Sequence, residues 1–209
     1  MNLKNRIILI LGGTGSVGGA TAKFLEREGA TVVCHGLNSG EWRADLSKDG
    51  EAKRLINAIS AKYGRVDVVI NSIGASLKLA PIEKKNWDDY QAQLEVQLRA
   101  AVEITSAVAP IMKNDKKGII LHVITSGVDE VPSHMIDYLT AKYALMGFAR
   151  ASERELARFG IKVLYIKPRF IKNDFTRDMP EKAVEMMEAK GEVTTPEEVA
   201  EEIWTTLKS

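Results

Sequence analysis

The sequence predicts an α/β protein with a doubly wound parallel sheet and helices on both faces, formed by residues 1–209 as a single domain. Short runs rich in valine, leucine and isoleucine alternate with longer stretches of helical period, a pattern typical of βαβ units and a parallel sheet. The chain has 209 residues, of which 45% are hydrophobic. This length and composition suffice to bury one sizeable core.

The predicted strands are mostly near-continuous apolar runs, as expected when helices cover both faces of a sheet. They occupy 6–11, 31–35, 66–71, 119–125 and 161–167, with a further short strand before Asp45. Helical periodicity predicts helices over 16–28, 48–63, 86–113, 138–158 and 196–208. Thr195, Pro196 and Glu198 form a predicted capping box at the start of the last helix. Residues 36–41 are too few for a crossover helix, so we expect a loop there.

Charge and composition exclude several classes of partner. The 29 lysine and arginine residues nearly balance the 28 aspartate and glutamate residues, so nothing favours nucleic acid or an acidic membrane. The single cysteine, Cys34, cannot form an internal disulfide, and the N-terminus lacks the apolar core of a signal peptide. No apolar run approaches the roughly 18 residues that span a bilayer. We expect a cytoplasmic protein with a small-molecule ligand and no metal site.

A glycine-rich turn follows the first predicted strand and opens the first predicted helix. Residues 13–18 match the pattern G-x-G-x-x-G in the strand-to-helix context that makes this pattern informative. Glycine allows a tight turn and close backbone approach, and the exposed N–H groups at a helix N-terminus favour an anion such as a pyrophosphate. The turn therefore predicts a dinucleotide site formed by Gly12, Thr14, Gly15, Ser16, Val17 and Gly18.

The turn after the second strand bears on the choice between NAD and NADP. A carboxylate that would bind the adenosine ribose is expected there, but residues 35–39 read His-Gly-Leu-Asn-Ser. No arginine lies in this turn either, and His35 and Arg43 are the nearest candidates to receive a 2′-phosphate. The missing carboxylate makes the sequence lean slightly toward NADP.

Four motifs in order resemble those of the short-chain dehydrogenases/reductases, and the resemblance covers nearly the whole chain. They are the glycine turn, Asp45 in "ADLS", the segment "NSIG" at 71–74, and Tyr138 with Lys142 in "YLTAK". The resemblance implies a Rossmann-type domain and an NAD(P)-dependent oxidoreductase that transfers a hydride between nicotinamide and a carbonyl or alcohol.

Tyr138 and Lys142 lie four residues apart, which places both on one face of a helix. A neighbouring ammonium favours the phenolate, so we expect a lowered pKa for Tyr138, as a general acid/base requires. The resemblance implies that Tyr138 exchanges a proton with the substrate oxygen and that Lys142 also binds the nicotinamide ribose. The family's active-site serine corresponds to Thr125 by count and to Ser126 by residue type, and both stay open. Gln97 stands at the asparagine of the family's proton relay.

The resemblance also implies further cofactor and substrate contacts. Arg169 stands where the family has a glycine, and a cation there favours a substrate carrying carboxylate or phosphate. His134, in the loop before Tyr138, is a second candidate for substrate contact. The implied cofactor contacts beyond the glycine turn are Asn38, Asp45, Leu46, Asn71, Ser72, Gly74, Lys142, Pro168 and Asn173.

Two expectations concern assembly and activity. Similar proteins commonly pair the helices that correspond here to 86–113 and 138–158, which implies a homodimer or homotetramer. The altered residues at Gln97, Thr125, Asn173 and Arg169 leave a second interpretation open, namely a dinucleotide-binding sensor or structural subunit with weak or no catalysis.

Overall fold

A computed structural model describes residues 3–171, 181–189, 191 and 193–209. Its central sheet has six strands in the order β3-β2-β1-β4-β5-β6, and every pairing within it is parallel. This confirms the predicted doubly wound α/β fold. The strands are β1 (Ile7–Leu11), β2 (Thr31–Gly36), β3 (Trp42–Arg43), β4 (Val68–Asn71), β5 (Gly118–Val123) and β6 (Ile161–Ile166).

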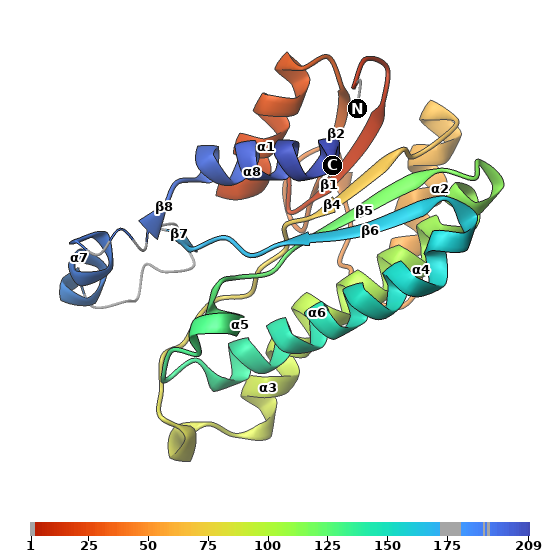
Figure 1. The fold of residues 1–209 in the computed structure, drawn as a ribbon. Coiled ribbons are helices and arrows are strands. Elements are labelled where there is room, and N and C mark those ends of the chain that lie inside the picture. The colour runs from red at the N-terminus through yellow and green to blue at the C-terminus, as the bar shows by residue number, and fades with distance from the viewer. Residues whose placement is uncertain (1–2, 172–180, 190, 192) are drawn as a thin grey trace.

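Helices cover both faces of this sheet (Figure 1). On one face lie α1 (Ser16–Arg27) and α8 (Pro196–Lys208), and on the other lie α2 (Glu51–Tyr63), α4 (Ala100–Asn114) and α6 (Ile136–Leu156). Successive strand residues face opposite sides, so each strand contributes to two separate cores. In β1, Ile8 and Ile10 join the core beneath α1 and α8, while Leu9 joins the core beneath α2 and α4.

The long helix predicted over 86–113 is interrupted. It consists of α3 (Trp87–Leu94), the π-helical turn η2 (Glu95–Arg99) and α4, preceded by the 3₁₀ turn η1 (Ile82–Lys84). Asn86 caps α3 in a capping box with Asp89. Figure 1 shows α3 alongside the start of α6. A π-helical turn changes the direction in which the following side chains point.

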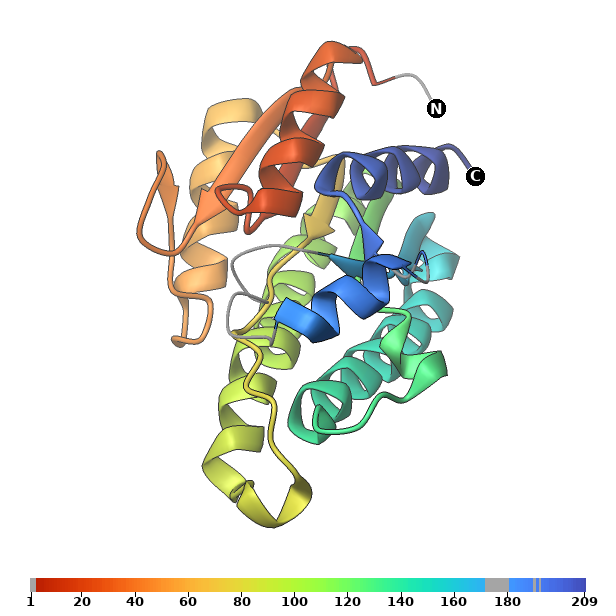
Figure 2. The same cartoon turned by 90° about the vertical axis from the view of Figure 1, so that its left-hand side faces the viewer.

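Most of the remaining elements lie near the carboxyl ends of the strands. A four-residue helix, α5 (Gly127–Glu130), follows β5, whereas the 3₁₀ turn η3 (Ala157–Phe159) joins α6 to β6 at the amino end of the sheet. After β6, strand β7 (Phe170–Ile171) pairs in parallel with β8 (Val193–Thr194), and α7 (Glu181–Ala189) lies between them in the chain. Figure 2 views these elements from the carboxyl ends of the strands, with α7 toward the viewer.

Two local predictions are confirmed. The β2–β3 connection contains no helix, as the short spacing predicted. Thr195 caps α8, because its hydroxyl accepts the Glu198 N–H at 3.1 Å while the Glu198 carboxylate accepts the Thr195 N–H at 2.8 Å. Within the described part of the chain, no helix is both long enough and apolar enough to cross a membrane.

Candidate active site

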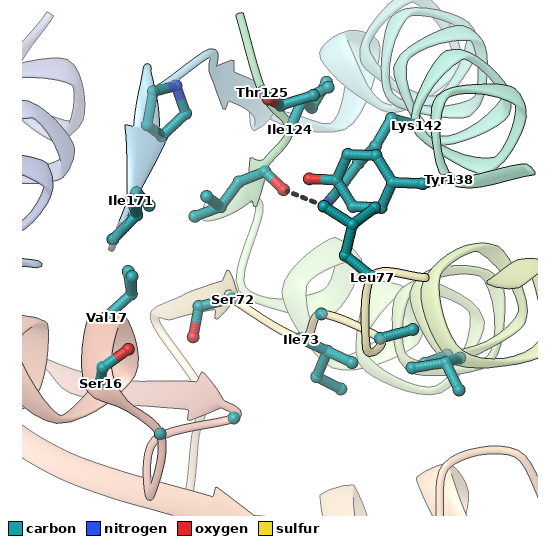
Figure 3. Close-up of a pocket in the computed structure, with 18 of the residues that line it drawn as sticks. Ser16, Val17, Ser72, Ile73, Leu77, Ile124, Thr125, Tyr138, Lys142 and Ile171 are labelled. Carbon is teal, nitrogen blue, oxygen red and sulfur yellow. Dashed lines mark hydrogen bonds between the residues drawn. The ribbon is translucent and has the colours of Figure 1, made fainter. Parts of the chain in front are cut away.

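A cavity of about 700 Å³ opens at the carboxyl ends of the strands. The chain leaves β1 toward β2 on one side and later places β4 on the other side, so the strand order reverses between β1 and β4. Ligands of open α/β sheets bind at such a switch point. The glycine turn and α6 both contribute residues to the cavity wall (Figure 3).

The glycine turn presents a helix N-terminus to this cavity. Gly15 is the N-cap of α1, no side chain caps the helix, and its first turn holds no acidic residue. The first N–H groups of a helix have no intrahelical acceptor and attract an anion. Ser16 and Val17 of this first turn line the cavity, together with Gly12, Thr14 and Gly15. The turn therefore fits the pyrophosphate of a dinucleotide.

Gly18 has a different role from the one predicted. It does not line the cavity, and a Cβ built on it would lie 2.2 Å from the Gly12 carbonyl oxygen. This contact requires glycine because α1 packs closely against the turn. Gly18 is thus a packing residue and does not contact the cavity.

Asp45 and Leu46, which were predicted to contact the cofactor, line the cavity beyond β2. The Asp45 carboxylate accepts the Ser47 hydroxyl at 2.6 Å and the Ser47 N–H at 3.1 Å. These hydrogen bonds hold the pKa of Asp45 below its usual range, so the group is anionic at neutral pH. Asn38, in contrast, does not line the cavity.

His35 is not available to a phosphate. It is buried, its Nδ1 accepts the Gly12 N–H at 3.4 Å, and its Nε2 lies 2.9 Å from the Ala44 carbonyl oxygen. Burial lowers the pKa of His35, so the ring is neutral at neutral pH. Arg43 is exposed and lies outside the cavity lining. Neither candidate for a 2′-phosphate therefore faces the cavity as a cation.

Within the segment 71–74, some residues line the cavity and others are buried behind its wall. Ser72 and Gly74 line the cavity, and the Ser72 hydroxyl donates to the Leu11 carbonyl at 2.7 Å. Asn71 was predicted to contact the cofactor, but it is buried outside the lining. Its Nδ2 lies 3.3 Å from Nδ1 of His122, and its Oδ1 accepts the Ile73 N–H. Asn71 therefore orients the segment from behind.

Tyr138 and Lys142 lie on one face of α6, as predicted, and both line the cavity. In Figure 3 the Tyr138 hydroxyl projects into the cavity, with Lys142 beside its ring. The Lys142 ammonium lies 5.6 Å from the ring centroid and donates to the Val123 carbonyl at 3.1 Å. Lys142 is buried, and burial lowers its pKa to about 8.

The predicted depression of the Tyr138 pKa is wrong for the protein without ligands. Burial raises this pKa to about 12, against a smaller opposing effect of a hydrogen bond with Thr125. Desolvation disfavours the phenolate more than the nearby groups stabilise it. Tyr138 is therefore protonated at neutral pH.

Thr125 and Ser126 both line the cavity. The hydrogen bond that opposes the rise of the Tyr138 pKa involves the Thr125 side chain. Thr125 Oγ1 also accepts the Gly127 N–H at 3.2 Å. The backbone N–H of Ser126 donates to the carbonyl of Pro168, which lines the cavity as predicted.

Two further candidates, Gln97 and His134, also lie outside the cavity lining. Gln97 sits buried in the π-helical turn, where its Nε2 donates to Gln93 Oε1 at 2.6 Å. His134 is exposed, and its carbonyl accepts the Ala80 N–H. Asn173 lies outside the described residues.

The wall around Tyr138 contains residues that the sequence did not single out. Leu77, Met135 and Leu139 form a small buried cluster against Tyr138 and line the cavity. The sequence gives a single indication of this cluster. Leu77 is an apolar residue in a stretch that lacks helical or strand periodicity. Arg169 also lines the cavity, and its Nη1 donates to the Gly191 carbonyl at 2.8 Å.

Known proteins are similar to this chain in sequence and in fold. Residues 12–207 match the family described as enoyl-(acyl carrier protein) reductase. A 3-oxoacyl-[acyl-carrier-protein] reductase of Thermotoga maritima is 29% identical over 97% of this chain and 90% of its own length. A sorbitol-6-phosphate 2-dehydrogenase of Klebsiella pneumoniae is 25% identical over 80% of this chain and 70% of its own length.

A crystal structure shows the same fold. The 3-ketoacyl-(acyl-carrier-protein) reductase of Brucella melitensis, complexed with NADH, superposes with a TM-score of 0.89 at 22% identity. The match covers 96% of this chain and 90% of that one. Together with the family match across most of the chain, these relatives confirm the predicted resemblance. The chain belongs to the short-chain dehydrogenase/reductase family and is an NAD(P)-dependent oxidoreductase of that family.

Proposed function

We propose that Tyr138 is the general acid/base of this oxidoreductase and that Lys142 assists it. The supporting observation is a hydroxyl that projects into the cavity beside Thr125, with a buried ammonium behind its ring. Loss of turnover with retained cofactor binding in Tyr138→Phe tests this assignment.

A nicotinamide cofactor bound at the glycine turn would supply the hydride for reduction of a substrate carbonyl. Tyr138 donates its proton to the carbonyl oxygen, and the positive charge of Lys142 stabilises the phenolate that remains. A phenol that is protonated at neutral pH suits this direction. In oxidation, the same phenolate would take the proton of the alcohol.

We assign the substrate-binding hydroxyl to Thr125, because it already shares a hydrogen bond with Tyr138. Thr125→Ala should lower kcat/KM by about 100-fold, the usual effect of removing one donor to a developing oxyanion. Ser126→Ala should lower it by less than about fivefold. Steady-state kinetics with one carbonyl substrate compare the two variants, and the reverse order of effects would assign the role to Ser126.

We propose a preference for NAD, although the sequence leans slightly toward NADP, and the residues at the β2 end of the cavity support this proposal. At the β2 end, the described lining consists of His35, Gly36, Leu37, Ala44, Asp45, Leu46 and Ser47, which include one carboxylate, one neutral imidazole and no lysine or arginine. A 2′-phosphate is usually bound by such cations. A Cβ on Gly36 would lie 2.5 Å from the Ser39 carbonyl oxygen, so the loop packs against this position and leaves no room for a side chain.

This cofactor preference predicts that NADH binds at least tenfold more tightly than NADPH. Leu37 lines the cavity and is 57% exposed, so Leu37→Arg adds a cation without opening the core. We expect NADPH to bind about 10–100-fold more tightly to this variant, as for a new charge-assisted hydrogen bond. Energy transfer from tryptophan to the bound cofactor measures both affinities. Wild-type protein that binds NADPH as tightly as NADH contradicts the preference.

Arg169 supports the proposal of a substrate that carries carboxylate or phosphate. Arg169 lines the cavity, and the hydrogen bond to the Gly191 carbonyl uses one of the five donors of its guanidinium. Arg169→Ala should raise KM for an acidic ketone about tenfold and leave KM for its neutral ester within about twofold. If Arg169→Ala changed KM equally for the two substrates, the proposal of an anionic substrate would be wrong.

The partners expected from sequence remain a proposal: a small carbonyl or alcohol, and a second copy of the chain. Exposed aromatic side chains on the two helices of the expected interface support the second copy, namely Trp87 of α3 and Tyr143 of α6. Light scattering of the purified protein at micromolar concentration distinguishes a dimer or tetramer from a monomer. A cytoplasmic location likewise remains a proposal.

A further inference from the structure

A buried ion pair lies directly beside the proposed acid/base. The Lys85 ammonium donates to Asp137 Oδ2 at 2.7 Å, and the two side chains are 1% and 3% exposed. Asp137 precedes Tyr138 and belongs to the first turn of α6. Burying two charges is costly, and an ion pair of this kind is weak evidence for a stabilising role. Its placement therefore calls for another explanation.

Lys85 joins three segments. Besides Asp137, its ammonium donates to the Lys78 carbonyl at 2.6 Å and so closes the loop formed by residues 76–85, called the 76–85 loop below. The next residue, Asn86, caps α3. The ammonium thus fixes the loop, the start of α3 and the start of α6 relative to one another.

The same loop forms the wall against Tyr138. Leu77, immediately before Lys78, packs with Met135 and Leu139 in the buried cluster that contacts Tyr138. The Ala80 N–H donates to the His134 carbonyl at 3.1 Å, which adds a backbone link between the loop and the approach to α6. Among the hydrogen bonds of the described chain, only the one between Lys85 and Asp137 joins this loop to the helical residue next to Tyr138.

We propose that Lys85 and Asp137 are positioning residues, which hold the first turn of α6 against the 76–85 loop and thereby place the Tyr138 hydroxyl in the cavity. This rests on the proposed role of Tyr138. A misplacement of about 1 Å can cost 100-fold in rate. An apolar pair of similar volume would fill the space without fixing the direction of the side chains.

The decisive variant replaces both charges, as Lys85→Met with Asp137→Leu. Removing Lys85 alone leaves an uncompensated buried carboxylate and should lower Tm by about 6–20 °C. The double variant should recover Tm to within about 4 °C of wild type, since the buried charge is gone. Its kcat should nevertheless stay 10–100-fold below wild type, with the dissociation constant of NADH within about twofold.

Hydrogen exchange gives a readout that does not depend on turnover. The Leu139 N–H donates to the Met135 carbonyl at 2.8 Å in the first turn of α6. Peptides covering 135–140 should exchange at least about tenfold faster in the double variant, because this turn loses its only ionic anchor in the described chain. Lys85→Arg keeps the ion pair. Its kcat and the protection of these peptides against exchange should therefore match those of the wild type.

Arg6→Met is the matched control for general destabilisation. Arg6 pairs with Asp67 at 2.6 Å, partly buried, at the amino end of the sheet and far from the cavity. This variant should lose Tm without losing kcat. A double variant with recovered Tm and wild-type kcat would overturn the positioning role. If Tyr138→Phe itself kept full activity, the proposed function would fail instead, and hydrogen exchange would still report whether the pair anchors α6.

Discussion

Tyr138→Phe should lower kcat by about 10²–10⁴-fold, the usual contribution of a positioned general acid/base. The substitution removes one oxygen and keeps the ring, so the packing against Leu77, Met135 and Leu139 is retained. Among the residues that the structure describes, the Thr125 side chain is the only hydrogen-bond partner found for this hydroxyl. NADH should therefore bind to the variant within about threefold of wild type.

Tyr143→Phe provides the same chemical change outside the cavity. Tyr143 lies one residue after Lys142 on α6, and its hydroxyl donates to the Val128 carbonyl at 2.5 Å. It is 41% exposed and does not line the cavity. Stopped-flow hydride transfer with NADH and a carbonyl substrate compares the two variants. Equal turnover in both would rule out the Tyr138 phenol and favour a dinucleotide-binding sensor.

The sequence predicted those parts of the site that depend on local spacing. The glycine turn after β1, and Tyr138 with Lys142 four residues apart, occupy the predicted elements and face one cavity. Each of these motifs lies within a single turn or helix. Local geometry, which spacing determines, therefore sufficed to place them.

The wrong predictions arose where the direction of a side chain depends on distant residues. Gln97 lies in a π-helical turn, which no periodicity in the sequence indicated, and it pairs with Gln93. Asn71 contacts His122 across neighbouring strands. The pair of Lys85 and Asp137 joins residues 52 positions apart, so no local pattern could reveal it.

Lys142→Met should have opposite effects on activity and stability. The variant loses the charge that stabilises the Tyr138 phenolate, so kcat should fall by about 10²–10³-fold. Burial shifts the pKa of Lys142 from 10.5 to about 8, which corresponds to roughly 3 kcal/mol at about 1.36 kcal/mol per unit. This free energy opposes folding at neutral pH, since the folded state must bury an ammonium. The variant also loses the hydrogen bond to the Val123 carbonyl, which costs about 1–2 kcal/mol and offsets part of its gain in stability.

The net gain for Lys142→Met at pH 7 is therefore about 1–2 kcal/mol, or roughly 2–8 °C in Tm. Below pH 8 both the folded and unfolded wild-type states are protonated, so this difference is constant. Between pH 8 and 10.5 the unfolded state binds more protons than the folded state, so wild-type stability rises with pH. The advantage of the variant should shrink across this window and disappear above it.

Thermal unfolding of both proteins at pH 7, 9 and 10.5, without cofactor, measures this dependence. Lys113→Met is the matched control, because Lys113 is a half-buried lysine whose ammonium lies 4.4 Å from the Phe159 ring, away from the cavity. The change in Tm that Lys113→Met causes at each pH is the reference for the change caused by Lys142→Met. A Lys142→Met protein less stable than wild type at pH 7 would mean that the ammonium gains more from its surroundings than it loses by burial. In that case, the active site would not hold the Lys142 ammonium at the expense of the stability of the folded protein.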